Sequence, residues 1–153
     1  MSRTAIQLQA AMEFGLRIQK ASQPKLGRIS TSFQVAQQLI EEWKDAPQEH
    51  LICLYLNTKN EIIQKRILFV GSLDQSIAHP REIFREAVRC SAARIIISHN
   101  HPSGNPEPSE NDRRFTLRLI KCGELVGIEV LDHLIIGQSS YVSLRERGLW
   151  QQR

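Results

Sequence analysis

The alternation of apolar and polar positions along the chain predicts a fold that mixes helices with strands. Apolar side chains that recur every three or four residues predict helices over residues 4–20, 32–44, 80–90 and 109–122. Alternating or continuously apolar runs, rich in β-branched residues, predict strands over residues 50–57, 61–71, 93–98, 127–137 and 140–144. This order of elements predicts an α/β sheet layered by helices.

Capping residues and helix breakers mark the limits of several elements. Ser32 is expected to cap the second helix, and Pro47 to stop it. Pro80 is expected to open the third helix, because proline is favoured in the first turn of a helix. The run over residues 93–98 is almost entirely apolar, which is typical of a strand covered on both faces. We therefore expect this run to form a central strand of the sheet.

The chain divides into a short N-terminal piece and one larger domain. A length of 153 residues suits a single domain with its own core. Residues 1–28 are predicted to form a helix and a linker that contains Pro24 and Gly27, and residues 29–153 to form the main domain. Because the chain begins inside a helix-like pattern, we expect the sequence to be a piece of a longer protein.

Composition argues against membrane and secreted classes. No run of about 18 apolar residues is present, so no segment is expected to span a membrane. The N-terminus carries charges throughout and does not match a secretory signal. Cys53, Cys90 and Cys122 form no C-x-x-C pair, which argues against a cysteine zinc site and a disulfide framework. Reduced, buried thiols indicate a reducing compartment, and we expect a cytoplasmic protein.

The net charge of +4 lies entirely in the N-terminal piece. Residues 1–28 hold five basic residues and one acidic residue, whereas the remainder holds 15 of each. The main domain therefore lacks the basic excess that is expected of a surface that follows a phosphate backbone. The N-terminal piece has that excess, although a charge run often forms only a solvated helix face.

The segment SHNHPSGNPEPSENDRR, at residues 98–114, concentrates side chains that bind metals. On a strand, His99 and His101 point to the same face. Three prolines and a glycine within the next seven residues stiffen the loop that follows. That loop brings Ser109 and Asp112 into the first turn of the next helix.

Two interpretations of this segment are open. In one, Ser109 and Asp112 form only a capping box, and the histidines form a hydrogen-bonded pair at a strand end. In the other, His99, His101 and Asp112 bind zinc, for which neutral imidazole and carboxylate are suitable ligands. We favour the second, because three ligand-type side chains meet across a stiff loop. Three protein ligands leave one tetrahedral position for water, which is typical of catalytic zinc.

A zinc ion with this ligand set would keep a net positive charge, so its water is expected to ionise near pH ~7. A hydrolase of this kind also needs a carboxylate that carries the proton and a donor for the developing oxyanion. Ser109 is the candidate donor, because a helix cap would hold its hydroxyl in place.

The spacing of these residues resembles a known motif. H-x-H, seven residues, serine, two residues and aspartate is the JAMM metalloprotease motif of the MPN domain. Residues 30–149, with HNHPSG at their centre, resemble the bacterial RadC family more closely. The resemblance implies a fold similar to cytidine deaminases, a mixed β-sheet flanked by helices with zinc at the sheet edge. It also implies a JAMM-type zinc hydrolase that cleaves an amide or isopeptide bond.

The same resemblance asks for a catalytic glutamate at the start of the first strand. Glu49 occupies that position. Glu82 and Glu86 are alternatives, because they lie on the helix that precedes the histidine strand. A glutamate among arginines on a helix face is more often solvated or paired. We therefore assign the base to Glu49.

The remaining histidines have less specific surroundings. His133 is expected to support or line the site, and His79 to be structural. His50 alternates away from Glu49 along the strand and is assigned no role. The literal HNH at residues 99–101 is not the HNH nuclease signature, whose three residues lie far apart.

RadC proteins usually carry an N-terminal helix-hairpin-helix segment that binds the DNA backbone. Residues 1–28 resemble only the last helix of that segment. The resemblance therefore implies DNA association through the missing N-terminal region and puts in doubt DNA binding by this chain.

Three functions from different classes are consistent with these patterns. The first is a zinc-dependent hydrolase that acts on an unknown protein or peptide. The second is a protein associated with DNA repair or mobile elements, with a DNA-binding or nuclease-like role, against which the neutral main domain argues. The third is a non-catalytic metal-binding module, against which an open ligand position argues.

Overall fold

The computed structural model describes residues 2–22, 27–71 and 79–150. The elements in chain order are α1 (Arg3–Ser22), α2 (Ser32–Glu42), β1 (Glu49–Leu56), β2 (Ile62–Gly71), α3 (Pro80–Arg89), β3 (Arg94–Asn100), α4 (Glu110–Val126), β4 (Glu129–Ile136) and β5 (Tyr141–Ser143). Each predicted helix and strand is present, with ends that differ by a few residues. Part of the predicted linker, including Pro24, lies outside the described residues.

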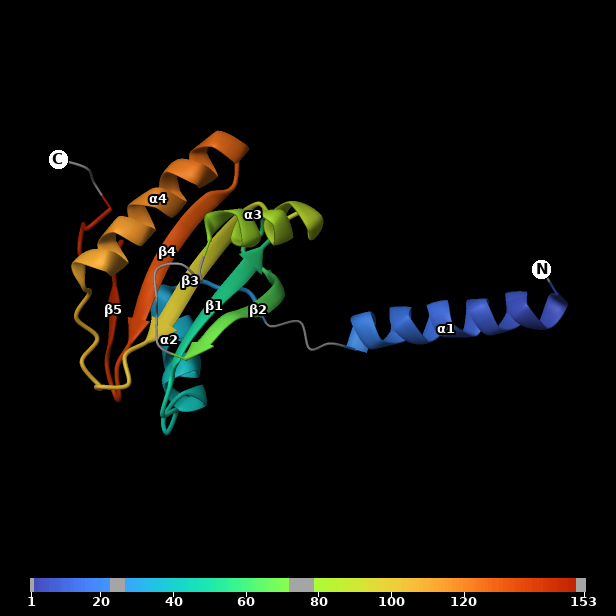
Figure 1. Cartoon of the computed structure of the whole chain (residues 1–153), viewed down its shortest axis with the longest axis horizontal. Helices are drawn as coiled ribbons and strands as arrows, with labels where there is room; N and C mark the ends of the chain where they lie inside the picture. Colours follow the sequence, from blue (N-terminus) through green and yellow to red (C-terminus); the bar gives the residue numbers. More distant parts are fainter. Residues whose placement is uncertain (1, 23–26, 72–78, 151–153) are drawn as a thin grey trace.

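The five strands form one mixed sheet in the order β2-β1-β3-β4-β5 (Figure 1). β1 runs antiparallel to both β2 and β3, β3 runs parallel to β4, and β4 runs antiparallel to β5. The run that was predicted as a central strand forms β3, in the middle of the sheet. The predicted fold class, a mixed β-sheet flanked by helices, is therefore confirmed.

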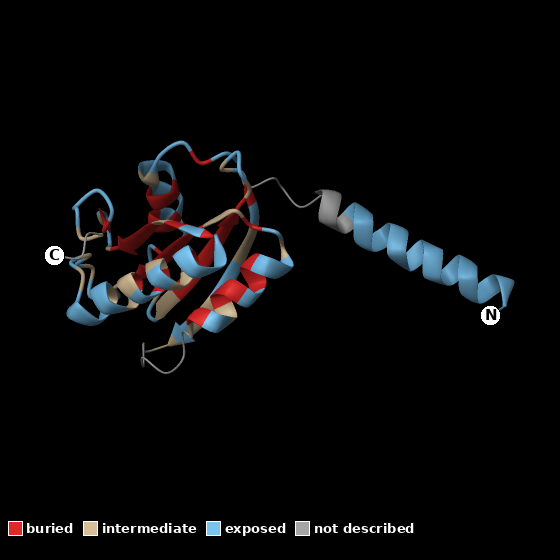
Figure 2. Ribbon diagram, turned by 90° about the horizontal axis from the view of Figure 1, so that it is seen from above, coloured by how far each residue is buried: buried red, intermediate tan, exposed pale blue. Residues whose placement is uncertain are grey.

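Alternation along the strands assigns each side chain to one of two covered faces. On one face, α2 packs its buried side chains, among them Leu39, against alternate residues of β1 and β3, such as Ile52 and Ile96. On the opposite face, α3 and α4 cover the other set, which includes Ile97 and Tyr55. Figure 2 shows buried residues along the strands and on the inner sides of these helices. We call the side covered by α3 and α4 the α3/α4 face.

A bulge in β4 sends two neighbouring polar residues to opposite faces. In the ladder with β3, Ile95 pairs with Val130 but Ile96 pairs with Asp132, so Leu131 is an extra residue. The bulge turns Asp132 toward α2. It turns His133 toward α4.

The cap of α2 differs from the prediction. Thr31 caps this helix, accepting a hydrogen bond from the amide of Gln34 at 3.3 Å. Ser32, predicted as the cap, is the first residue of the helix, and its Oγ donates to Asp132 Oδ2 at 2.6 Å. The prediction was wrong because two adjacent hydroxyl residues can each cap the helix, and the buried carboxylate of Asp132 binds the second. The helix also ends at Glu42, two residues before the predicted end.

The N-terminal helix α1 is present as predicted, and its described side chains, at residues 3–18, are exposed (Figure 2). Its apolar residues include Phe14, which is 65% exposed, and Leu8, which is 63% exposed. In residues 2–22, 27–71 and 79–150, no helix combines the length and the apolar character needed to cross a membrane. The division into an N-terminal piece and a main domain after residue 28 stays a prediction.

Candidate metal centre

The two histidines of the H-x-H motif lie at the end of β3 on the α3/α4 face. His99 shares that face with Ile97 by strand alternation and is buried, and His101 follows the last strand residue. Their Nε2 atoms are 3.0 Å apart. Opposite His99 in the ladder stands Leu51, so Glu49, two residues earlier on β1, faces the same side.

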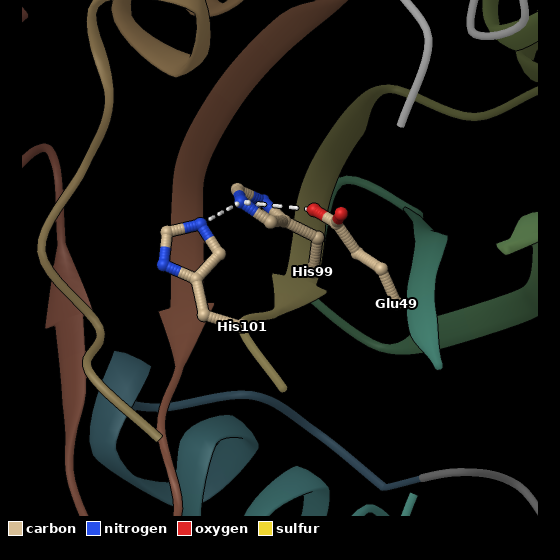
Figure 3. A group of neighbouring side chains, drawn as sticks. All are labelled: Glu49, His99 and His101. Carbon is tan, nitrogen blue, oxygen red and sulfur yellow. Dashed lines mark hydrogen bonds and ion pairs between the residues drawn. The ribbon is translucent and has the colours of Figure 1, made fainter. Parts of the chain in front are cut away.

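Glu49 and the two histidines form a compact group (Figure 3). One potential ligand atom from each residue lies within 4.8 Å of the others, and Glu49 Oε1 is 3.9 Å from His99 Nε2. Imidazole nitrogen and carboxylate oxygen are ligands that divalent transition metals accept. This group could therefore hold a metal ion.

Asp112 reaches the same place from the first turn of α4. Its Oδ1 is 3.3 Å from His99 Nε2, and its Oδ2 is 3.4 Å from His101 Nε2. The capping box is also present: Ser109 Oγ accepts from the amide of Asp112, and the Asp112 carboxylate accepts from the amide of Ser109 at 2.8 Å. The two interpretations of this segment therefore do not exclude each other, because the cap holds the carboxylate against the histidines.

A chain of hydrogen bonds from Thr116 through His133 sets the tautomer of His99. The hydroxyl of Thr116 donates to the Asp112 carbonyl at 2.6 Å, so it can only accept from His133 Nδ1. Burial lowers the pKa of His133 well below its ordinary value, which keeps this ring neutral with a single proton. His133 Nε2 must then accept from His99 Nδ1, at 2.8 Å. In the neutral His99 ring, Nε2 is then the atom without a proton, and it faces the site.

The loop after β3 sets the tautomer of His101 in the same way. His101 Nδ1 donates to the carbonyl of Asn105 at 2.8 Å. In the neutral ring, Nε2 is then an acceptor that points at His99 Nε2. When both rings are neutral, two nitrogen lone pairs and the Asp112 carboxylate therefore meet with no donor between them, an arrangement that a cation, either a proton or a metal ion, stabilises. The donor set fits a metal ion.

The pKa values of Asp112 and His101 show that a proton can take the place of the missing donor. Burial alone would raise the pKa of Asp112, but hydrogen bonding to His101 and His99 outweighs burial and holds this pKa well below its usual range. The hydrogen bond with Asp112 raises the pKa of His101, against the opposing effect of burial. A proton on His101 is thus one cation that satisfies the cluster, and a metal ion would have to displace it.

Asn100, which the sequence interpretation did not single out, fixes the backbone around Glu49. Its side chain points to the α2 side of the sheet, where Oδ1 accepts from the amide of His50 at 2.6 Å. Its Nδ2 donates to the carbonyl of Gln48 at 3.1 Å. The two residues that flank Glu49 are therefore bound to the residue between the two histidines. The sequence shows only that an asparagine stands between the two histidines, and no neighbouring residue identifies its hydrogen-bond partners.

The rival glutamates lie elsewhere. Glu86 is buried in an ion cluster with Arg66 and Arg89, and Glu82 pairs with Arg85 near the start of α3. Neither belongs to the compact group with the histidines.

Of the remaining histidines, one lies beside the site and two lie away from it. His133 is buried against His99, and His79 caps α3 through its side chain. The ring of His50 stacks on Trp43, on the other side of the sheet.

Acid is expected to destabilise the protein through Glu86. A hydrogen bond from Arg89, helped by Gln64 and Arg66 and opposed by burial, lowers the pKa of Glu86 from 4.5 to about 2. Since the folded-state pKa is depressed, the stabilisation is complete above pH 4.5 and is lost as the pH falls from 4.5 toward 2. Glu86→Gln should flatten this part of the curve of unfolding free energy against pH, measured by urea denaturation. Glu82→Gln, on the same helix, should leave it unchanged; equal curves for both variants would contradict the assignment.

The cluster opens into a pocket of about 400 Å³ between β1, β3 and α4. Glu49 and the two histidines line its inner end, together with Ser109 and Asp112. Leu51, Phe115 and two arginines of α4 complete the wall. A substrate group can therefore reach the histidines and the carboxylates from solvent.

Ser109→Ala is expected to reduce stability and, in the hydrolase that the resemblance implies, turnover as well. The hydroxyl accepts from the Asp112 amide, and among the residues that the structure describes its own hydrogen has no acceptor, so it can donate into the pocket. Loss of an oxyanion donor typically lowers the rate by about 10²–10³-fold, and loss of an N-cap costs about 1 kcal/mol. Steady-state kinetics and urea denaturation measure the two effects. Thr31→Ala removes a comparable cap from α2 and should cost stability without a comparable loss of rate; equal loss of rate would refute the donor role.

The fold and these side chains define an α/β domain with a histidine–carboxylate cluster that could bind a metal ion. The chain belongs to the family of RadC-like JAB domains, because the model of that family matches residues 29–149. A UPF0758 protein of Enterococcus faecalis is 60% identical over 95% of this chain and 63% of its own length. The UPF0758 protein YsxA of Bacillus subtilis is 51% identical over 94% of this chain and 62% of its own length. The chain thus spans less than two thirds of these relatives.

Proposed function

We propose that this domain is a zinc-dependent hydrolase of the JAMM type that cleaves an amide or isopeptide bond. The observation that supports this most is the meeting of His99 Nε2, His101 Nε2 and the Asp112 carboxylate, 3.0 to 3.4 Å from one another, at the inner end of an open pocket. His99, His101 and Asp112 would be the metal ligands. Zinc, when bound, supplies a Lewis acid and a water that ionises near pH ~7.

The remaining residues of the site have the chemistry that hydrolysis requires. The carboxylate of Glu49 would accept a proton from the attacking water and deliver it to the leaving nitrogen. The hydroxyl of Ser109 would donate a hydrogen bond to the carbonyl oxygen as negative charge develops on it. His133 and Asn105 would hold the two imidazoles in the tautomer that leaves each Nε2 free.

The substrate in this proposal is an unidentified protein or peptide. The pocket has a volume of about 400 Å³, and its wall includes apolar surface from Leu51 and Phe115 beside the carboxylates. We place the protein in the cytoplasm, because Cys53, Cys90 and Cys122 are all free thiols in the described structure.

The experiment that tests this proposal combines metal analysis with an unbiased peptide-cleavage screen. The purified chain is loaded with zinc, incubated with a peptide library with and without chelator, and the products are identified by mass spectrometry. We expect cleavage that chelator abolishes and added zinc restores. If the zinc-loaded chain cleaves nothing in the screen, or if cleavage survives chelation, the hydrolase is refuted; bound zinc without cleavage indicates a metal-binding module.

A role in DNA repair or at mobile elements is the second candidate, and the charge of the N-terminal piece is the observation in its favour. All of the net charge of +4 belongs to residues 1–28. The main domain has equal numbers of basic and acidic residues. DNA association would therefore depend on residues 1–28, together with any N-terminal region of a longer protein, and the pocket would act on a protein at the DNA.

Residues 29–153 alone are expected to bind duplex DNA only weakly. With no net charge, this part should show non-specific affinity no tighter than about 10⁻⁴ to 10⁻⁶ M at physiological salt. Fluorescence anisotropy with a labelled duplex at several salt concentrations measures the affinity and its salt dependence, and residues 1–153 serve as the comparison. Sub-micromolar binding with a steep salt dependence would overturn this expectation and favour the second candidate.

A further inference from the structure

One wall of the pocket is cationic. Asn111, Arg114, Phe115 and Arg118 of α4 line it at intervals of three, four and seven residues. This spacing places them on one side of the helix, above the inner end that contains Asp112. The pocket therefore has carboxylates where the reaction would occur and guanidinium groups farther out.

The two arginines have little to neutralise them within the protein. In the part of the chain that the structure describes, Arg118 has no acidic partner. Arg114 has only Glu110, at 3.6 Å, and both of these side chains are mostly exposed. Such an exposed pair contributes little energy and exchanges readily for another anion.

Some other arginines of the domain are bound closely by acids. Arg147 binds Glu107 at 2.7 Å, and Arg89 binds the buried Glu86 at 2.8 Å. The charge that faces the pocket is therefore available to a ligand.

We propose that Arg114 and Arg118 bind an acidic side chain of the peptide substrate, close to the bond that is cleaved. This inference rests on the proposed function for the reaction and adds the class of substrate. Guanidinium groups bind carboxylates through paired, charge-assisted hydrogen bonds. Phe115 and Leu51 add apolar contact for the aliphatic part of such a residue.

The helix geometry gives the position of the acidic residue. Along α4, with a rise of about 1.5 Å per residue, Arg114 lies about 3 Å and Arg118 about 9 Å beyond Asp112. An extended peptide advances about 3.3 Å per residue. For a peptide that runs alongside α4 with its scissile bond near Asp112, the acidic residue would lie one to three residues from that bond.

A peptide suits this wall better than a nucleic acid does. A duplex is bound by a wide basic surface that contacts many phosphates, whereas the main domain has no net charge and the pocket also exposes Glu49 and Asp112. Those two carboxylates would repel a phosphate row that reached the histidines. Two guanidinium groups a helical turn apart match one or two carboxylates.

The test measures binding first, in the metal-free chain, so that it does not depend on turnover. The probes are blocked Gly/Ala heptapeptides with a single glutamate at each position in turn, matched peptides with glutamine, and a single-stranded DNA dodecamer. Titrations are followed by NMR and calorimetry. We expect the best glutamate peptide to bind at least about tenfold tighter than its glutamine match.

Substitutions on α4 then test whether Arg114 and Arg118 cause the preference for glutamate peptides. Arg114→Gln and Arg118→Gln should remove it, and Arg118→Glu should reverse it, so that the glutamine peptide binds tighter than its glutamate match. Arg113→Gln is the matched control, because Arg113 is an exposed arginine of the same helix that does not line the pocket, and it should keep the preference. Equal affinity for glutamate and glutamine peptides, or equal effects of the control and the pocket variants, would overturn the inference. Tighter binding of the dodecamer that Arg118→Gln abolishes would overturn the peptide assignment.

Kinetics of the zinc-loaded chain separate this inference from the proposed function. For a cleaved glutamate peptide, Arg118→Gln should raise KM at least about tenfold and change kcat little, because the contact is remote from the reacting atoms. A binding preference without any cleavage would refute the hydrolase but support the anion site. Cleavage without a preference for acidic peptides would support the hydrolase and refute the anion site.

Discussion

His101→Ala and Asp112→Asn are expected to lower the zinc content sharply from about one ion per chain. Each variant removes one of the three proposed ligands, and a two-ligand site binds zinc far more weakly. Asparagine is preferable to alanine at Asp112, because its amide oxygen can still accept from the Ser109 amide in the capping box. Metal content is measured by mass spectrometry after dialysis against a weak chelator.

Matched controls distinguish loss of a ligand from general damage. His50→Ala removes a histidine that faces the α2 side of the sheet, and Glu110→Gln removes a carboxylate two residues before Asp112. Both should retain full zinc. If His101→Ala and Asp112→Asn also retain it, the metal site is somewhere else.

The domain should nevertheless fold without metal. Its two larger buried clusters in the described part of the chain, around Leu39 and Ile96 on one side of the sheet and around Ile97 and Leu119 on the other, consist of apolar side chains whose packing needs no ion. Circular dichroism of the chelated protein checks this directly.

Local rules were sufficient to predict the sheet and the histidine pair. Strand alternation places His99 and His101 on one face whatever the rest of the chain does, and a capping box places Asp112 in the first turn of its helix. These relations span only a few residues, so the sequence reveals them. Glu49 needed the resemblance to a family, because its proximity to the histidines depends on the register of β1 against β3.

Contacts between distant segments could not be read from the sequence. The bulge at Leu131 decides that Asp132 faces α2 and His133 faces α4, and a one-residue insertion in a ladder leaves no clear pattern in the chain. Asp132 then binds Ser32, which made the cap prediction fail. The clamp of Asn100 on the backbone around Glu49 joins segments fifty residues apart. Function at this edge thus depends on contacts that form only when the sheet assembles.

Glu49→Gln should abolish most of the hydrolysis while leaving the metal and the fold in place. In the proposed mechanism, Glu49 accepts a proton and is not a ligand. The glutamine amide can still hydrogen-bond a water but cannot take its proton. General acid–base catalysis typically contributes about 10²–10⁴-fold, so turnover should fall by that factor. Single-turnover kinetics on a peptide from the cleavage screen, together with metal analysis, measure both quantities.

The structure makes this prediction specific to one carboxylate. Glu49 Oε1 lies 3.9 Å from His99 Nε2 and lines the inner end of the pocket, whereas Glu82 lies on α3 in an ion pair with Arg85. Glu82→Gln is therefore the matched control and should retain wild-type turnover. Loss of zinc from Glu49→Gln would show that Glu49 is a ligand rather than the base. Full turnover with full zinc would show that another group moves the proton, and the histidine–aspartate metal site would still stand.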